Sequence, residues 1–379
     1  MLQFHENGKF TILCFGDLHE SNNFDGEGKV RFNDMKALME AALNEFQPDL
    51  CVYMGDNCST RGLDTEEGLA AYRKTVDAIT ESVRRRNIPF ASVFGNHEHD
   101  HGNEDKILAT YEGLQGCLMR NDAPEITGYA NYSEPILSSD GKRTAFQLWF
   151  MDSNNLCPDK SVSKYDWVKQ DQIHWYEKKA AELKAQNGGE SVPALLFQHI
   201  PVCEEYELTR KAHFWEIPVA VRGCNTKEHT FYVLKKGIQG YLGEGPCSPD
   251  LNAGQFESWK KTGDIIGAVF GHDHMNDFCG TVDGIALMQC KTAGFGCYTD
   301  GCRSGVRVIT LDENNPRTFQ TQMKHFKEFG LRSQLLNWEF RNLTDRQSIN
   351  LTIGTRVAAG VAAAAGIGYG ISKLIKMKK

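Results

Sequence analysis

Short apolar runs that lead into a polar residue recur along much of the chain. Five of them have the length of buried β-strands and cover residues 11–16, 50–55, 90–95, 194–197 and 264–270. Each run is followed within two positions by Asp, Asn or His, and all but the fourth pass through a glycine. In α/β proteins, ligands gather beyond the carboxyl ends of the strands. The pattern therefore predicts that these polar residues meet at one site.

Stretches with apolar residues at helical spacing separate the first strands. One covers residues 32–46 and stops before Pro48, and another covers residues 64–83. These β-α-β units predict an α/β fold with a largely parallel sheet. We expect a further amphipathic helix at residues 171–186. Further strands are expected at residues 144–152, 192–198, 284–290 and 305–312, the last two closing a second sheet.

The polar residues that follow the five runs are of the types that bind metal ions. They are Asp17, His19, Asp56, Asn96, His199, His272 and His274. Carboxylate, amide and imidazole groups are the oxygen and nitrogen ligands of Mn, Fe, Zn and Mg sites. His272 and His274 follow a turn at Gly271, where their side chains could face different metal ions. Taken alone, this pair is equally consistent with two unrelated histidines on a loop.

Together, these motifs resemble a known family. The order Asp-x-His, Gly-Asp, Gly-Asn-His-Glu, a lone His and Gly-His-x-His is similar to that of the calcineurin-like metallophosphoesterase superfamily, over roughly residues 9–312. Residues 168–177, 271–280 and 294–296 resemble a narrower branch, the small single-domain purple-acid-phosphatase-like phosphohydrolases. The resemblance implies a four-layer α/β/β/α sandwich of two mixed sheets flanked by helices. Its metal site would lie at the carboxyl ends of the strands.

The same resemblance implies a dinuclear-metal-dependent phosphoric ester hydrolase. Phosphate esters are inert, and two metal ions can stabilise the charge that develops during their hydrolysis. Asp56 is the expected bridge between the ions, because a carboxylate can bind both. The resemblance assigns Asp17, His19 and His274 to one ion and Asn96, His199 and His272 to the other. The two divalent or trivalent ions are expected to be Mn, Fe or Zn, and a hydroxide bridging them would attack the phosphorus.

One departure from the purple enzymes concerns Ser59 and His19. Purple enzymes have a tyrosine ligand where this chain has Ser59, and they lack the histidine that stands here as His19. We therefore expect no tyrosinate–iron charge-transfer band.

His97 is the expected catalytic residue, because it adjoins Asn96 and could reach the leaving oxygen as a general acid. Glu98 is not expected to bind a metal ion itself but to orient His97 through a hydrogen bond. Asp273 either supports the ligands in the same way or is solvated. The nearby His99 and His101 are interpreted as exposed loop residues.

Three functions share these motifs. The main expectation is a phosphomonoesterase that acts on a phosphorylated small molecule or phosphoprotein. A phosphodiesterase or nucleotidase on the same scaffold is the alternative within the enzymes. A non-catalytic metal-binding scaffold protein is the alternative outside them.

Composition narrows the class of protein further. The chain has 379 residues, of which 41% are hydrophobic and 24% charged, as in ordinary globular proteins. Its net charge of −7 disfavours binding to nucleic acid. The twelve cysteines include no Cys-x-x-Cys pair, and several lie within apolar strands. We therefore expect reduced thiols and a cytoplasmic location.

Residues 1–330 are expected to form the catalytic domain, followed by a linker or helical segment at 331–355. Residues 203–252 break the strand pattern and lie between two ligand motifs, so they are expected to form a substrate-shaping insertion, with an ordinary surface insertion as the alternative.

The tail at residues 356–379 is uncharged from 357 to 372 and has four lysines among its last seven residues. We expect it to be a membrane anchor on the cytosolic face of an internal membrane, although a spanning helix needs about 17–25 apolar residues. A helix docked on the enzyme's own surface and a flexible tail are the alternatives.

Overall fold

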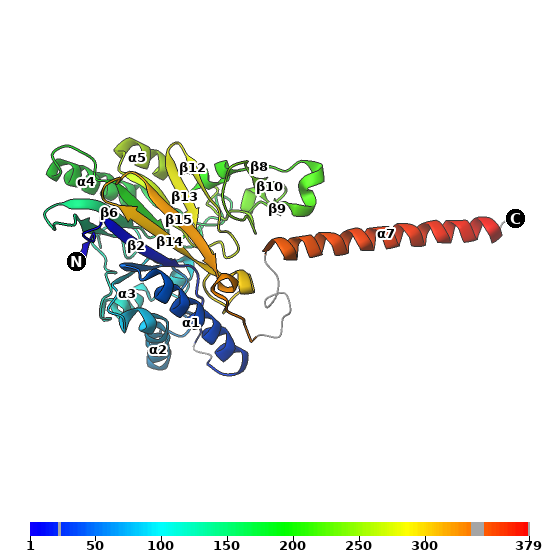
Figure 1. Ribbon diagram of the computed structural model, residues 1–379, viewed down its shortest axis with the longest axis horizontal. Helices are drawn as coiled ribbons and strands as arrows, with labels where there is room; N and C mark the ends of the chain where they lie inside the picture. The colour runs from blue at the N-terminus through cyan, green and yellow to red at the C-terminus, as the bar shows by residue number, and fades with distance from the viewer. Residues whose placement is uncertain (22–23, 335–344, 378–379) are drawn as a thin grey trace.

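Two mixed β-sheets pack against each other at the centre of the molecule, with helices on their outer sides (Figure 1). The computed structural model describes residues 1–21, 24–334 and 345–377. One large hydrophobic cluster joins the two sheets and includes Leu13 and Val52 from one and Leu148 and Phe197 from the other. This cluster forms because successive side chains of a strand point to opposite faces, so one face of each sheet can be buried against the other.

The first sheet carries three of the five runs identified in the sequence. Its order is β15-β14-β2-β3-β4. These strands are β2 (Lys9–Phe15), β3 (Leu50–Tyr53), β4 (Phe90–Ser92), β14 (Gly305–Asp312) and β15 (Phe319–His325). Strands β2, β3 and β4 are parallel, whereas β14 is antiparallel to both of its neighbours. The carboxyl ends of β2, β3 and β4 therefore lie at the same edge of the sheet.

The second sheet carries the other two runs, in the order β1-β5-β6-β7-β11-β13-β12. Its strands are β1 (Leu2–Gln3), β5 (Tyr132–Leu137), β6 (Thr144–Phe150), β7 (Ala194–Gln198), β11 (Ile265–Phe270), β12 (Cys279–Val282) and β13 (Ile285–Gln289). Strands β6, β7, β11 and β13 are parallel, and β12 is antiparallel to β13. Strand β5 is antiparallel to β6 and parallel to β1. Both sheets are thus mixed, as expected for the sandwich. We expected residues 284–290 and 305–312 to close one second sheet. This prediction is wrong, because β13 and β14 belong to different sheets.

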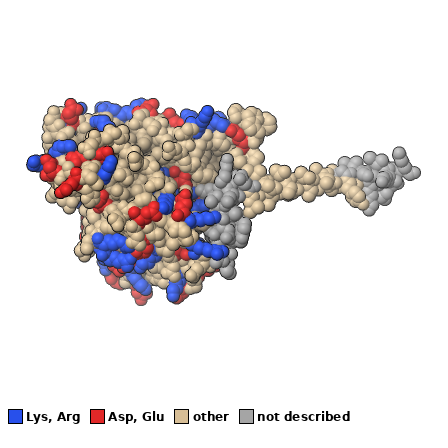
Figure 2. Space-filling model, viewed as in Figure 1, with Lys and Arg blue, Asp and Glu red and all other residues tan. Residues whose placement is uncertain are grey.

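Helices cover the outer faces of the sandwich (Figure 1). They are α1 (Gly26–Phe46), α2 (Glu66–Arg84), α3 (Glu104–Glu112), α4 (Gln170–Gln186) and α5 (Gln255–Thr262). Helices α1 and α2 contribute Leu38 and Val76 to the central cluster, while α4 and α5 pack on a second cluster through Tyr176 and Trp259. Short 3-10 helices connect these elements: η1 (Asn96–His99), η2 (Cys203–Leu208), η3 (Phe214–Val219), η4 (Asn225–Lys227), η5 (Gly301–Arg303) and η6 (Phe326–Phe329). On the face shown in Figure 2, positive and negative side chains are interspersed over the body of the protein.

The insertion forms a small sheet of its own, in the order β8-β10-β9. Its strands are β8 (Thr209–Lys211), β9 (Val221–Arg222) and β10 (Phe231–Leu234). The 3-10 helix η3 exposes large apolar side chains, including Phe214 at 79% and Trp215 at 64%.

Helix α7 (Asp345–Met377) includes most of the tail and projects away from the body (Figure 1). Its side chains at 354–367 are exposed, so over these residues the helix is not docked along the enzyme's surface. Within the described ranges, no helix is both long and apolar enough to cross a bilayer, and the expected membrane anchor is therefore not supported. Residues 335–344 of the expected linker and residues 378–379 of the tail lie outside the described residues.

Candidate metal centre

The seven predicted ligands converge at the carboxyl ends of the central strands. Asp17 and Asp56 follow β2 and β3, and His272 follows β11. Four of the seven, Asp17, His19, Asp56 and His272, have left-handed backbones, with φ angles of 43°, 44°, 50° and 71°. A non-glycine residue in such a conformation costs of order 1–3 kcal/mol, and it persists only where the surrounding structure holds it. Ten described non-glycine residues have positive φ, and four of them are predicted ligands, which supports a functional site at the strand ends.

The glycines that end the strands allow the close approach of these loops. A Cβ atom on Gly95 would lie 2.2 Å from Asp56 Oδ1, and one on Gly16 would lie 2.4 Å from the carbonyl oxygen of Cys290. Real Cβ atoms do not come this close to another atom, so any larger residue would force the backbone to move. Glycine is therefore needed at these positions for close packing as well as for the turn.

Two clusters of side chains form around the two aspartates. In the first, His274 Nε2 lies 3.6 Å from Asp17 Oδ1 and 3.1 Å from His19 Nε2. In the second, potential ligand atoms of Asp56, His199 and His272 all lie within 4.8 Å of one another. Asp56 Oδ2 also lies 3.6 Å from His19 Nε2 and 3.2 Å from His199 Nε2. Asp56 therefore lies between the clusters, where a bridging ligand would be needed.

Unpaired buried atoms show that this donor set fits metal ions. His272 Nε2 and Asn96 Oδ1 are buried and have no hydrogen-bond partner. The Nδ1 atom of His199 lies 2.7 Å from the carbonyl oxygen of Met54, so its Nε2 atom, which faces Asp56 Oδ2 at 3.2 Å, is the one positioned to bind a metal ion. Buried polar atoms without partners are costly, and a bound metal ion would remove that cost here.

The protonation states of the histidines also suit metal binding. Burial lowers the pKa of His19 to about 4 and that of His274 to about 3, with neighbouring histidines adding to the effect. Burial, followed by His199, also holds the pKa of His272 well below its usual value. These imidazoles are neutral, which is the form that binds metal. Burial opposes protonation of His199, but Asp56 and Asp17 raise its pKa to about 10, so metal binding at His199 displaces a proton.

His97 lies at the edge of the centre with its ring about half exposed. Its Nε2 atom is 3.9 Å from Asp56 Oδ2, and its Nδ1 atom is 2.5 Å from Asp100 Oδ2. Burial alone would lower the pKa of His97, but Asp56 and Asp100 outweigh it and raise that pKa. The ring is thus held by Asp100 in a position to donate a proton from Nε2.

Glu98 does not orient His97 as expected. Its buried carboxylate instead accepts hydrogen bonds from the backbone N–H groups of Asp56 at 2.8 Å, Asn57 at 3.1 Å and Gly95 at 2.8 Å. The carboxylate reaches these donors because they lie on two adjacent strand ends that face it. Glu98 therefore supports the loop of Asp56.

Asp273 is fully buried, so the solvated interpretation is wrong. Its carboxylate accepts bonds from Asn276 Nδ2 at 2.8 Å, Gln289 Nε2 at 3.2 Å and the backbone N–H of Cys247 at 3.2 Å. Asp273 therefore anchors the loop between His272 and His274 to the insertion.

His99 is not an exposed loop residue either. It lies between two carboxylates, with Nε2 3.0 Å from Asp152 and Nδ1 3.2 Å from Glu104. His101 is exposed, as expected.

Several residues near the centre were missed by the sequence pattern. Cys297 offers a thiol within 4.8 Å of ligand atoms of His19 and His274. Tyr298 stacks on His274 with ring centroids 4.0 Å apart, and its carbonyl oxygen lies 2.7 Å from His274 Nδ1. The Tyr165 ring meets His272 edge-on, with centroids 4.4 Å apart. The motif at residues 294–296 was the nearest signal for the first two.

A hollow of about 250 Å³ opens beside the centre. It is lined by His19, Cys58, Ser59, Thr60, Arg61, His97, Asp100 and His101. The hollow is thus in contact with both a predicted metal ligand, His19, and the predicted general acid, His97.

Comparison with known proteins agrees with this geometry. The family model for calcineurin-like phosphoesterases matches residues 10–276. The chain belongs to this family. It is a metal-dependent phosphoesterase, and the superfamily expected from the motifs is confirmed.

Curated relatives share about a quarter of the sequence. The chain is 27% identical over 344 residues to probable inactive purple acid phosphatase 29 of Arabidopsis thaliana, covering 83% of this chain and 80% of that protein. It is 26% identical over 345 residues to phosphatase DCR2 of Saccharomyces cerevisiae, covering 84% of this chain and 54% of that protein. A crystal structure of a dimetal phosphatase from Danio rerio is 12% identical, with a TM-score of 0.45, and covers 84% of this chain and 99% of that one.

Proposed function

We propose that the protein is a phosphomonoesterase with a dinuclear metal centre. The observation that carries the proposal is the pair of side-chain clusters joined at Asp56. Asp17, His19 and His274 would hold one ion, Asn96, His199 and His272 the other, and Asp56 both. When bound, two metal ions supply Lewis acidity and activate water at neutral pH. The donor set of carboxylate, amide and imidazole suits Mn, Fe and Zn.

His97 completes the proposed reaction by protonating the leaving alkoxide. His97 lines the hollow, its Nε2 atom lies 3.9 Å from Asp56 Oδ2, and Asp100 holds the opposite ring nitrogen. The raised pKa of His97 favours the protonated ring, which is the form a general acid needs. Asp100 takes the positioning role that the sequence suggested for Glu98.

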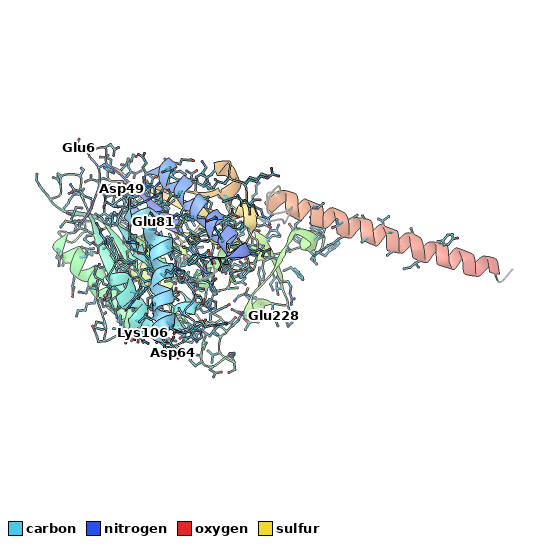
Figure 3. The ribbon with its side chains drawn as sticks, turned by 90° about the horizontal axis from the view of Figure 1, so that it is seen from below. Glu6, Asp49, Asp64, Glu81, Lys106 and Glu228 are labelled. Carbon is cyan, nitrogen blue, oxygen red and sulfur yellow. The ribbon has the colours of Figure 1, made fainter. Side chains whose placement is uncertain are left out.

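The hollow supports a monoester with a small alcohol part. Its volume of about 250 Å³ is below the roughly 300–1,000 Å³ of drug-sized ligand sites, so one small organic group fills it. The exposed guanidinium of Arg61 would bind an anionic group on that alcohol part. Lys106 of α3 supports this loop by donating to the carbonyl oxygen of Leu63 at 2.7 Å, and Figure 3 shows Lys106 close to Asp64.

Two other functions remain to be separated by experiment. A phosphodiesterase or nucleotidase would use the same metal ligands but must hold two organic groups. A non-catalytic metal-binding protein is the second alternative, since three Arabidopsis relatives have "inactive" in their names. The complete donor set and His97 favour turnover in this chain. We include a cytoplasmic location in the proposal on the basis of the cysteine pattern.

The test compares a nitrophenyl phosphate monoester with the bis-nitrophenyl diester, which has the same leaving group. The protein is stripped with a chelator and reloaded with Mn²⁺, Fe²⁺ or Zn²⁺. We expect kcat/KM for the monoester to exceed that for the diester at least about tenfold, or about 1.4 kcal/mol. Equal or reversed values would contradict a monoesterase, and no turnover with any metal would favour the non-catalytic alternative.

Arg61 offers a second readout on the alcohol part. Arg61→Ala should raise KM for a monoester with a second anionic group and leave KM for nitrophenyl phosphate unchanged. Arg73→Ala, which removes an exposed arginine of α2 outside the hollow, is the matched control. Equal effects of the two variants would remove Arg61 from the proposal.

A further inference from the structure

Two cysteine thiols of the insertion are in direct contact. Cys224 Sγ and Cys247 Sγ lie 2.6 Å apart, and both are reduced thiols in this structure. A disulfide bond is about 2.05 Å long, so the two sulfurs need to approach by only about 0.5 Å. Both cysteines are partly exposed to solvent.

The backbone around the pair is already held in place on both sides. Both thiols lie within hydrogen-bond distance of the carbonyl oxygen of Gly245, at 2.9 Å for Cys224 and 3.4 Å for Cys247. Asn225, the residue after Cys224, donates a hydrogen bond from its Nδ2 atom to the carbonyl oxygen of Ser248 at 2.9 Å. A bond between the sulfurs would therefore join two segments that already pack together, and their backbones would not have to move far.

The two cysteines also link the insertion to the metal centre. Cys224 lies between β9 and η4. The backbone N–H of Cys247 donates to Asp273, which lies between His272 and His274. A covalent bond between the cysteines would therefore tie the small sheet of the insertion to the loop that carries two metal ligands.

We propose that Cys224 and Cys247 are a redox modification site that closes into a disulfide in response to a hydroperoxide and locks the insertion to the Asp273 loop. Cys224 is the attacking thiol. Its thiolate attacks the peroxide O–O bond to form a sulfenic acid and release hydroxide, which takes up a proton to become water. The Cys247 sulfur then displaces the sulfenic oxygen, which leaves as a second water. In total, two thiols lose two electrons and two protons to one hydrogen peroxide.

The electrostatics agree with the order of attack. The hydrogen bond from Cys247 lowers the pKa of Cys224, whereas that bond and burial raise the pKa of Cys247 well above its usual value. The thiolate is the reactive form, so Cys224 is the more reactive of the two.

Peptide mapping tests the proposal without depending on catalysis. Trypsin places Cys224 in the peptide 223–227 and Cys247 in the peptide 237–260, each with a single cysteine. After treatment with hydrogen peroxide, alkylation of the remaining thiols and digestion, we expect these two peptides to appear cross-linked. Two of the twelve thiols should be lost per chain, and dithiothreitol should restore both.

Variants and hydrogen exchange test the two parts of the proposal separately. Cys224→Ser should abolish the cross-link, whereas Cys203→Ser, at a nearby cysteine of the same insertion, should retain it. Peroxide should also slow hydrogen exchange in β8 and β10 of the wild-type protein and not of Cys224→Ser. If the pair stays reduced while other thiols oxidise, or if either cysteine pairs elsewhere, the disulfide site is wrong. Unchanged exchange after cross-linking would overturn the lock.

Discussion

Replacing Glu98 by glutamine tests how the protein holds the bridging aspartate. One carboxylate oxygen of Glu98 accepts the N–H groups of Asp56 and Gly95, both at 2.8 Å, and the other accepts that of Asn57 at 3.1 Å. Glutamine has the same shape but only one accepting oxygen. In its best orientation, the glutamine amide oxygen still accepts hydrogen bonds from the N–H groups of Asp56 and Gly95. The amide nitrogen then faces the N–H of Asn57, which loses its acceptor.

The magnitude follows from this count of donors. One buried donor left unpaired costs about 1–3 kcal/mol of stability, and Glu98→Ala, which leaves three unpaired, costs up to about 3–9 kcal/mol if the losses add. The left-handed backbone of Asp56, with φ of 50°, also loses part of its support. Replacing a residue that holds a metal ligand in place by hydrogen bonds lowers metal affinity by about 10–100-fold, and we expect that loss for Glu98→Gln.

The assay combines urea unfolding with a metal titration against a competing chelator. Glu104→Gln is the matched control, because Glu104 bonds His99 and does not face the metal ligands. Glu104→Gln should lower stability while leaving metal affinity unchanged. If Glu98→Gln binds metal as tightly as the wild-type protein, the proposed support of Asp56 is wrong.

Three further predictions follow from other parts of the structure. His97→Ala should lower kcat by roughly 10²–10⁴ for alkyl phosphates, less for nitrophenyl phosphate, and leave metal content intact; equal losses would argue against a general acid. Burial opposes the charge on His99, but Asp152 and Glu104 raise its pKa to about 10, so its stabilisation is fully present below about pH 6.5 and lost as the pH rises through about 10. Urea unfolding should show that decline, to an upper limit of roughly 5 kcal/mol, in the wild-type protein and not in His99→Gln. Truncation after Thr355 should leave kcat/KM for nitrophenyl phosphate unchanged, because the predicted ligands all precede residue 275; a large loss would give the tail a role in the site.

The sequence indicated which polar side chains lie close together, because each proposed metal ligand follows a buried strand. Parallel strands bring their carboxyl ends to one edge, so the short pattern of apolar run, glycine and ligand predicts which residues meet. Gly95 and Asp56 illustrate the physical reason, since the space between them admits no Cβ atom. Local sequence and global packing agree at these positions.

The surroundings of the ligands could not be found in the same way. Tyr165 and Tyr298 reach His272 and His274 from loops that have no periodic pattern. His99 follows the ligand motif closely, but its burial depends on Asp152, which lies 53 residues away in the sequence. The strand order was also hidden, because β13 and β14 follow one another in the chain and join different sheets. Long-range contacts of this kind leave no local signal.

Metal counting on the wild-type protein and Asp56→Asn shows whether Asp56 bridges two metal ions. Each protein is loaded with Mn²⁺, freed of excess metal, and measured for bound metal per chain and for turnover of nitrophenyl phosphate. We expect two bound ions and turnover for the wild-type protein. For Asp56→Asn we expect the loss of at least one ion and of turnover, because a neutral amide bridges two cations poorly. Two retained ions with near-normal turnover in Asp56→Asn would show that Asp56 is not the bridge.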